Sequence, residues 1–276
     1  MTTFQYIIDA IFGAIAFVMP VPEVISQDLY KNLLKWPTST FDTRLLITLM
    51  GSACILVFFR YDWLGLVSAV IKSIIRPMTL KATTRSLDQH TSLFLILIII
   101  PSWVAQKWLL PWVSENEWAQ HPFLIAGIFF LIAGLFHFSA NWNKRLKGLN
   151  HVRLIDGLFI GGLTLFSAHP AISLVFVLWI GFALTNYHYE TLFKYSYLIL
   201  GVHLIIRFFE LLHEVSLKSA INTVGHLNSI AILVISTTTF WLILENLEKN
   251  LNESMLKTFK WFSILFGLFF VAIYFV

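Results

Sequence analysis

The chain has 276 residues, of which 58% are hydrophobic and 12% charged, and its formal net charge is +4. With a mean hydropathy of +0.77, this composition excludes a soluble globular protein. It indicates an all-α polytopic membrane protein, because in lipid every backbone polar group needs an internal partner. The unbroken apolar runs exclude the alternating strands of a membrane barrel. The basic residues lie in short loops, where topology and lipid headgroups account for them without a nucleic-acid partner.

The first apolar segment, 4–34, is predicted to form a re-entrant helical hairpin, because Pro20-Val21-Pro22 interrupts it and polar residues follow. It contains Ile8-Asp9-Ala10-Ile11-Phe12, which returns in mid-chain as Ile155-Asp156-Gly157-Leu158-Phe159. A carboxylate is costly inside a bilayer and usually marks a protein-lined or watery cavity. The repetition therefore indicates a duplicated membrane unit with a polar centre.

Six apolar runs are each close to the ~20 residues that a bilayer core requires. They predict membrane crossings at 44–68, 92–113, 122–140, 190–213, 226–245 and 258–276. A further segment, 154–187, consists of two short apolar pieces broken at His169-Pro170, and this pattern predicts a second re-entrant hairpin.

The two halves of the chain, residues 1–150 and 151–276, thus each hold one hairpin and three crossings within one integral membrane domain. Because three is odd, the second half is expected to be inverted relative to the first, with a ligand site at the repeat interface. Basic residues concentrate in the loops 71–91 and 141–153. Two crossings separate these loops, so both are expected on the cytoplasmic face.

Several short stretches, spread over nearly the whole chain, carry a family resemblance through their order and spacing. They are Pro20-Val21, Leu49-Met50-Gly51, Phe59-Arg60-Tyr61-Asp62, Ile100-Pro101, Ile160-Gly161, Pro170-Ala171-Ile172-Ser173, Glu190 and Ser196-Tyr197-Leu198-Ile199. Through them the chain resembles the undecaprenyl-pyrophosphate phosphatase family of bacterial inner-membrane enzymes. The resemblance implies two inverted repeats with re-entrant hairpins, and hydrolysis of the diphosphate of a polyprenyl lipid carrier to its monophosphate.

The residues on which the chemistry of that family rests are replaced in this sequence. The family carries two glutamates before its first Pro-Val, serine and histidine after it, and an arginine in its second motif. The matched positions hold Gly13 and Phe17, or Ala16 and Pro20, then Pro22-Glu23-Val24-Ile25-Ser26, and finally Ser173-Leu174-Val175-Phe176. Phosphoryl transfer depends on positioning and electrostatic stabilisation. These replacements therefore predict a divergent member without the ancestral reaction.

Two interpretations of Asp9 and Asp156 stay open. In the first, the two carboxylates line the central cavity as ligand-binding groups or proton carriers. In the second, they stabilise the starts of re-entrant helices, where acids favour the positive end of the helix dipole.

A second set of candidates shares one face of the crossing 190–213, because its members are spaced by four, three and four residues. The set is His203, Arg207, Glu210 and Glu214. Arg207 is either a substitute anion contact or part of a helix interface near the membrane surface, paired with Glu210.

Four further residues are weaker candidates. Ser26 and Ser173 are hydroxyl donors suited to phosphate oxygens, although serine also bonds commonly to a helical carbonyl. Glu23 and His169 are the fallback catalytic candidates, although each also suits a helix end. The sequence has no set of histidines and carboxylates with convincing metal spacing, so no metal or cofactor is expected.

Three functions follow as hypotheses. The first is a catalytically silent relative that binds or translocates a polyprenyl-phosphate-type lipid in the bacterial inner membrane. The second is a working phosphatase with relocated residues such as Glu23, His169 and Arg207. The third is a structural subunit of an envelope complex, with a vestigial cavity. The partners expected are a membrane lipid and either a second copy of the chain or an envelope protein.

Overall fold

The computed structural model describes residues 2–18, 40–75, 87–109, 112–113, 121–139, 147, 152–168, 172–251 and 253–275. Over these residues the chain forms eleven α-helices, and the only strand-like pairing is an isolated bridge between Lys147 and Tyr187. Four helical segments are long and apolar enough to cross a membrane: Phe41–Phe58, His90–Leu109, Tyr189–Glu214 and His226–Asn250. The predicted all-helical, multi-span character is therefore confirmed.

The helices of the first half are α1 (Thr3–Val18), α3 (Phe41–Phe58), α4 (Arg60–Ile75), α5 (Leu87–Val104, continued by a π-helical turn at Ala105–Leu109) and α7 (Pro122–Ser139). Those of the second half are α8 (Leu154–Thr164, followed by a 3₁₀ turn at Leu165–Ala168), α9 (Leu174–Leu184), α10 (Tyr189–Glu214), α11 (Leu217–Val224), α12 (His226–Asn250) and α13 (Glu253–Phe275). Four predicted crossings are thus helices with nearly the expected bounds: 122–140, 190–213, 226–245 and 258–276.

The segment 44–68, predicted as one crossing, consists instead of two helices. Thr40 is the N-cap of α3, and its hydroxyl accepts a hydrogen bond from the Thr43 N–H. Phe59 (φ −99°, ψ 26°) is the C-cap. Phe59 is buried and its ring lies 5.8 Å from that of Phe193 on α10. Asp62 then lies in the first turn of α4, where an acid favours the start of a new helix.

The segment 154–187 contains two short helices, α8 and α9, as the broken apolar pattern predicted. The break at His169-Pro170 itself lies outside the described residues. Of the segment 4–34, only α1 is described. Whether either segment enters and leaves the membrane on one side stays a prediction.

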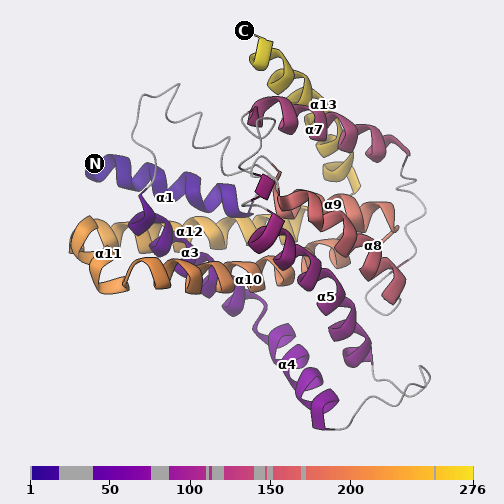
Figure 1. Ribbon diagram of the computed structural model, residues 1–276, viewed down its shortest axis with the longest axis horizontal. Helices are drawn as coiled ribbons and strands as arrows, with labels where there is room; N and C mark the ends of the chain where they lie inside the picture. The colour runs from indigo at the N-terminus through magenta and orange to yellow at the C-terminus, as the bar shows by residue number, and fades with distance from the viewer. Residues whose placement is uncertain are drawn as a thin grey trace.

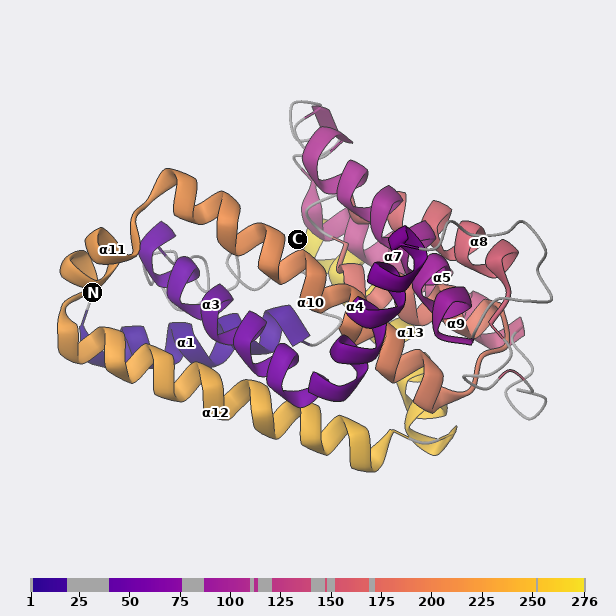
Figure 2. The same ribbon diagram turned by 90° about the horizontal axis from the view of Figure 1, so that it is seen from below.

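The helices pack in pairs that join one half of the chain to the other. α1 packs along α12, α8 along α5, α3 along α10, and α7 along α13. Both views show α1, α3, α11 and α12 toward one end of the molecule and α5, α7, α8, α9 and α13 toward the other, with α10 running between the two groups (Figures 1 and 2). The most extensive helix packing therefore joins distant parts of the sequence.

Small residues allow these helices to approach closely. A Cβ at Gly127 of α7 would lie 2.9 Å from the carbonyl oxygen of Gly267, and a Cβ at Gly267 of α13 would lie 2.9 Å from that of Gly127. Small residues at such crossings are typical of membrane helices, which associate through van der Waals packing because lipid is as apolar as their side chains.

The tightest crossing joins α5 and α8. Pro101 lies inside α5 and has no N–H, so the carbonyl of Leu97 lacks its usual amide donor four residues later. Gly161 of α8 lies against this carbonyl, and a Cβ there would overlap the oxygen and come within 3.1 Å of Cγ of Pro101. One turn earlier, Gly157 lies against Phe94. Because Gly157 and Gly161 are one turn apart and carry no side chain, the backbone of α8 lies directly against α5.

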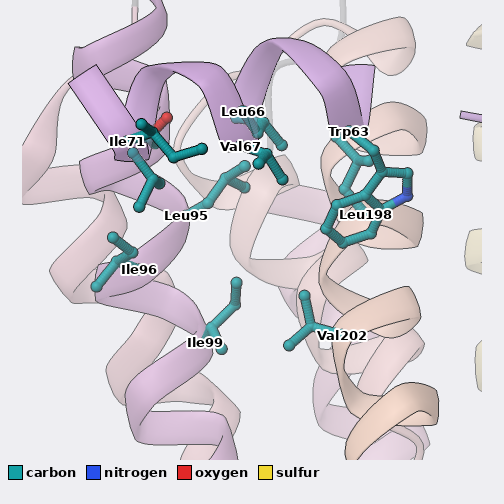
Figure 3. A pocket seen from close by; sticks show the side chains of 11 residues that line it. Trp63, Leu66, Val67, Ile71, Leu95, Ile96, Ile99, Leu198 and Val202 are labelled. Atoms are coloured by element: carbon teal, nitrogen blue, oxygen red, sulfur yellow. The ribbon is translucent and has the colours of Figure 1, made fainter. Parts of the chain in front are cut away.

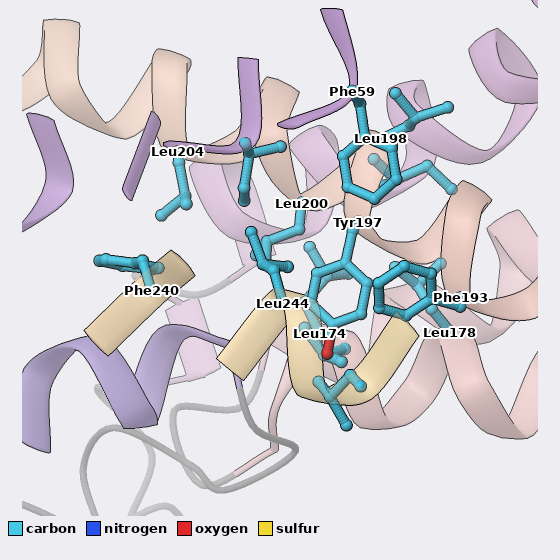
Figure 4. Close-up of a cluster of buried hydrophobic side chains, with 14 of the residues drawn as sticks. Phe59, Leu174, Leu178, Phe193, Tyr197, Leu198, Leu200, Leu204, Phe240 and Leu244 are labelled. Carbon is cyan, nitrogen blue, oxygen red and sulfur yellow. The ribbon is translucent and has the colours of Figure 1, made fainter. Parts of the chain in front are cut away.

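The main core lies where α3, α9, α10 and α12 meet. It is built largely from aromatic and leucine side chains, and Figure 4 shows Tyr197 and Phe193 of α10 surrounded by leucines of α9 and α12. α9 is buried on all sides, with every residue from Leu174 to Ala183 shielded. A helix that is apolar all round is expected at such a central place.

We expect Gly161→Ala to destabilise the protein, because its Cβ would collide with the backbone of α5, and forced repacking costs about 1–3 kcal/mol. The neighbouring substitution Gly162→Ala is a matched control, since a Cβ at Gly162 would meet no atom within 4 Å. Thermal unfolding in detergent measures both. Equal unfolding temperatures for the two variants would contradict the close crossing.

Candidate functional site

Asp156 is the centre of a polar network at the start of α8. Its Oδ2 atom lies 2.7 Å from Nζ of Lys147 and accepts a hydrogen bond from the Tyr187 hydroxyl at 3.0 Å. The side chains of Lys147 and Asp156 are only 21% and 13% exposed. The network therefore neutralises a carboxylate that is largely shielded from solvent.

Tyr187 joins this network to the backbone on both sides. Its hydroxyl also accepts a hydrogen bond from the Arg153 N–H at 3.1 Å, and its ring centre lies 5.3 Å from Nζ of Lys147. The backbone of Lys147 pairs with that around Tyr187, where the His188 N–H donates to the Lys147 carbonyl at 2.9 Å. Lys147, in the connection between the halves, is thereby fixed to the segment after α9.

The two repeated aspartates differ in their surroundings. Asp156 lies in the first turn of α8, as the helix-start interpretation predicts, whereas Asp9 lies inside α1, whose first turn has no acid. α1 and α8 lie at opposite ends of the molecule in both views (Figures 1 and 2). The structure therefore does not bring Asp9 and Asp156 together at one centre.

His203 is buried within α10 and is hydrogen-bonded through Nε2 to the hydroxyl of Ser102 on α5. The Ser102 hydroxyl also donates to the Ile99 carbonyl at 2.9 Å. Ser102 directly follows Pro101 and precedes the π-helical turn of α5. The partner that an intramembrane histidine requires is thus a serine on another helix, at the place where α5 is irregular.

Arg207 lies near the end of α10 with its side chain exposed. Its Nη1 atom lies 3.4 Å from Oε2 of Glu210, which is the pair that the spacing predicted. His203 is buried while Arg207 is exposed, so the predicted set of residues on one face of α10 does not form one site. Arg207 thus has the Glu210 partner of the second interpretation, although both side chains are exposed and do not close a helix interface.

Glu214, the last member of the set on α10, is exposed at the end of that helix. Of the four weaker candidates, only Ser173 is described. It precedes α9 at the N-cap position, but its side chain makes no capping hydrogen bond. Glu23, Ser26 and His169 lie outside the described residues. No group of three histidine, cysteine, aspartate or glutamate side chains with metal-binding geometry occurs in the part of the chain that the structure describes.

A polar pocket of about 380 Å³ lies where α3, α4 and α10 meet the end of α12. An ion pair between Lys194 and Asp62 forms part of its wall. The other charged lining residues are Glu190 and Glu248. Three carboxyl groups and one lysine give a surface that repels a diphosphate and favours a cationic or neutral polar group.

Sequence reasoning missed the partners in these contacts, although one general signal pointed to them. Lys194 and His203 are polar residues in a predicted crossing, and each finds a partner on a different helix, Asp62 and Ser102 respectively. A charge or imidazole at membrane depth requires such a partner. The sequence does not say which residue supplies it, because the partners are far apart along the chain.

The fold and these contacts define a multi-pass α-helical membrane protein with paired charges inside a largely apolar bundle. A family model described as bacitracin resistance protein BacA matches residues 8–269. The match spans most of the 276 residues, so the protein belongs to the BacA family, which is the undecaprenyl-pyrophosphate phosphatase family that the sequence resembles. A search of curated proteins found no significant match.

We expect Asp156→Asn to lower the stability of the protein, because Lys147 would remain shielded without its anionic partner, at a cost of about 1–3 kcal/mol. The double variant Lys147→Met with Asp156→Asn should cost less than the sum of the two single changes. Thermal unfolding measures the cycle. Glu245→Gln, which breaks the exposed Lys249 pair on α12, is the control and should have a small effect. Additive single losses would count against the network.

Ser102→Ala should also destabilise the protein, because buried His203 would lose its hydrogen-bond partner, again at about 1–3 kcal/mol. Ser52→Ala provides the comparison, since Ser52 is buried in α3 and its hydroxyl donates to the Thr48 carbonyl of its own helix. Chemical unfolding in detergent would show the difference. If both variants lose the same stability, the contact with His203 contributes nothing.

Proposed function

We propose that the protein binds or translocates a polyprenyl-phosphate-type lipid in cell-envelope metabolism, and that it does not carry out phosphatase chemistry. The observation that carries this proposal is the burial of α9 at the second family motif. Leu174, matched to the family's arginine, is 8% exposed, and Val175 and Phe176 are each 1% exposed. Leu174 lies beside Tyr197 and Phe193 in the main core (Figure 4). A leucine in this place offers no contact to a diphosphate.

The first motif supports the same conclusion. Gly13 packs so closely on α3 that a Cβ there would lie 2.8 Å from Cδ1 of Ile47. Ala16 is buried, and Phe17 packs against the main core. At these three matched positions the space is used for helix packing, whereas a glutamate would need solvent, a cation or a proton to balance it.

The inverted-repeat architecture is part of the proposal, and the reciprocal helix pairing supports it. α1 packs on α12 as α8 packs on α5, and α7 packs on α13 through paired glycines. Ala10 and Ala14 of α1 are fully buried and have the same spacing as Gly157 and Gly161 of α8. Both hairpin helices therefore present a small-residue face to the other half. In such repeats the ligand site lies at the interface between the halves.

We place the protein in the bacterial inner membrane, with the loops 71–91 and 141–153 on the cytoplasmic side. The bias of lysine and arginine toward these two loops supports this orientation. The described basic residues of the second loop, Lys147 and Arg153, lie together beside the start of α8.

The proposal is tested with the purified protein in liposomes of phosphatidylethanolamine and phosphatidylglycerol. We expect polyprenyl monophosphate to co-purify with the protein, as detected by mass spectrometry, and no phosphate to be released from a polyprenyl diphosphate. The same preparation serves both measurements, so bound lipid shows that an inactive sample is folded.

Two results would overturn the proposal. Release of phosphate that is lost in Glu23→Gln would show a phosphatase with a relocated acid. Absence of any bound polyprenyl lipid, in a preparation that unfolds cooperatively, would leave the role of a structural subunit.

A further inference from the structure

The polar pocket lies where three membrane-crossing helices end. Phe58 is the last residue of α3, Tyr189 is the first of α10, and Glu248 lies in the last turn of α12. All three helices are long and apolar enough to cross a membrane, so their ends place the pocket at the level of the lipid headgroups. An occupant can therefore reach it either from water or from the adjoining leaflet.

Contacts between α4 and α10 hold the walls of the pocket in place. Asp62 in the first turn of α4 forms an ion pair with Lys194 of α10. The next residue, Trp63, lies beside α10 near Leu198 (Figure 3). Its ring also lies against Gly201, where a Cβ would be 3.0 Å from Cζ2 of the indole. The walls are therefore fixed before a ligand binds, which lowers the entropic cost of binding.

Aromatic rings form the apolar side of the pocket. Phe58, Phe59, Tyr189 and Phe193 line it, and the ring centres of the buried residues Phe59 and Phe193 are 5.8 Å apart. The face of an aromatic ring carries partial negative charge, so it attracts a cation that lies within about 6 Å of its centre. These rings therefore favour an organic cation, whose alkyl carbons also gain apolar contact with them.

The negative charge of the pocket comes from Glu190 and Glu248, because the charges of Asp62 and Lys194 neutralise each other. The Oε2 atom of Glu190 lies 3.9 Å from Nδ1 of His188, which is beyond hydrogen-bond distance. Glu248 forms no ion pair with any residue that the structure describes. Two carboxylates thus remain to accept charge-assisted hydrogen bonds from a ligand.

We propose that the polar pocket binds the ammonium group of an amine, with the rings against its alkyl carbons and with Glu190 and Glu248 as acceptors for its N–H groups. The amine is supplied either by the headgroup of a lipid such as phosphatidylethanolamine or by a small amine in solution. In the lipid, the phosphate stays outside the pocket, because the carboxylates repel it. A divalent metal ion fits less well, because the aromatic walls offer it no oxygen ligands.

The test uses the full-length protein in detergent and two matched pairs of probes. Native mass spectrometry compares phosphatidylethanolamine with phosphatidylethanol, which has the same phosphate and chains but lacks the ammonium group. Isothermal titration calorimetry compares ethanolamine with ethylene glycol, its uncharged analogue. In at least one pair, we expect the amine to bind about tenfold more tightly than its partner, since one hydrogen bond to a charged group has about this effect.

Variants then locate the binding. Glu190→Gln combined with Glu248→Gln removes both carboxylates and should abolish the roughly tenfold preference for the amine. Glu210→Gln combined with Glu245→Gln is the matched control, because it removes one exposed carboxylate from each of the same two helices outside the pocket. It should leave the preference unchanged. All four side chains lie at the surface, so both double variants should unfold close to the wild-type temperature.

The outcomes distinguish the source of the amine and can overturn the inference. A preference for phosphatidylethanolamine that only the pocket variant loses would identify a lipid headgroup, and the same result with ethanolamine would identify a soluble amine. Equal binding within both pairs of probes would overturn the inference. Equal losses in the two double variants would also overturn it, because general surface charge would then hold the cation. Neither failure would affect the proposed function, which concerns a different ligand.

Discussion

The contact between the backbones of α5 and α8 is the constraint on which much of this fold depends. Pro101 removes an amide donor from α5, and Gly161 lets α8 lie directly on the carbonyl that is left. With α8 fixed in this way, Asp156 at its start meets Lys147 and Tyr187, and α9 returns through the centre of the bundle. Ser102, next along α5, reaches His203 on α10. The close contact between the backbones of α5 and α8 thus determines where several polar groups can lie.

Three polar contacts within this apolar bundle are pairs that join different parts of the chain. Lys194 with Asp62, His203 with Ser102, and Lys147 with Asp156 are such pairs. A charge removed from water is tolerated only with a partner, and breaking the pair costs more than replacing both members. The pairs therefore fix which helices are neighbours. Apolar packing alone would specify this weakly in lipid.

Sequence reasoning was successful where the signal is local and failed where it depends on partners far along the chain. Apolar length alone was enough to predict α7, α10, α12 and α13, and a spacing of three residues was enough for the Arg207–Glu210 pair. The bend at Phe59 has no glycine or proline to announce it, so the two helices α3 and α4 were predicted as one. The repeated motif singles out Asp156, but no local pattern singles out Lys147 and Tyr187, because their contacts with Asp156 depend on how the chain after α9 returns to the start of α8.

The pairing of α1 with α12 also determines the order in which the protein can be assembled. α1 is synthesised long before its partner α12, because the two helices are far apart along the chain. Until α12 arrives, the face that carries Ala10 and Ala14 must remain against lipid or against a component of the insertion machinery, because contacts of such long sequence separation form late. The unit from Lys147 to Tyr187 can close much earlier, since α5 is already in the membrane. The packing of α1 on α12 is therefore expected to form after the packing of α8 on α5.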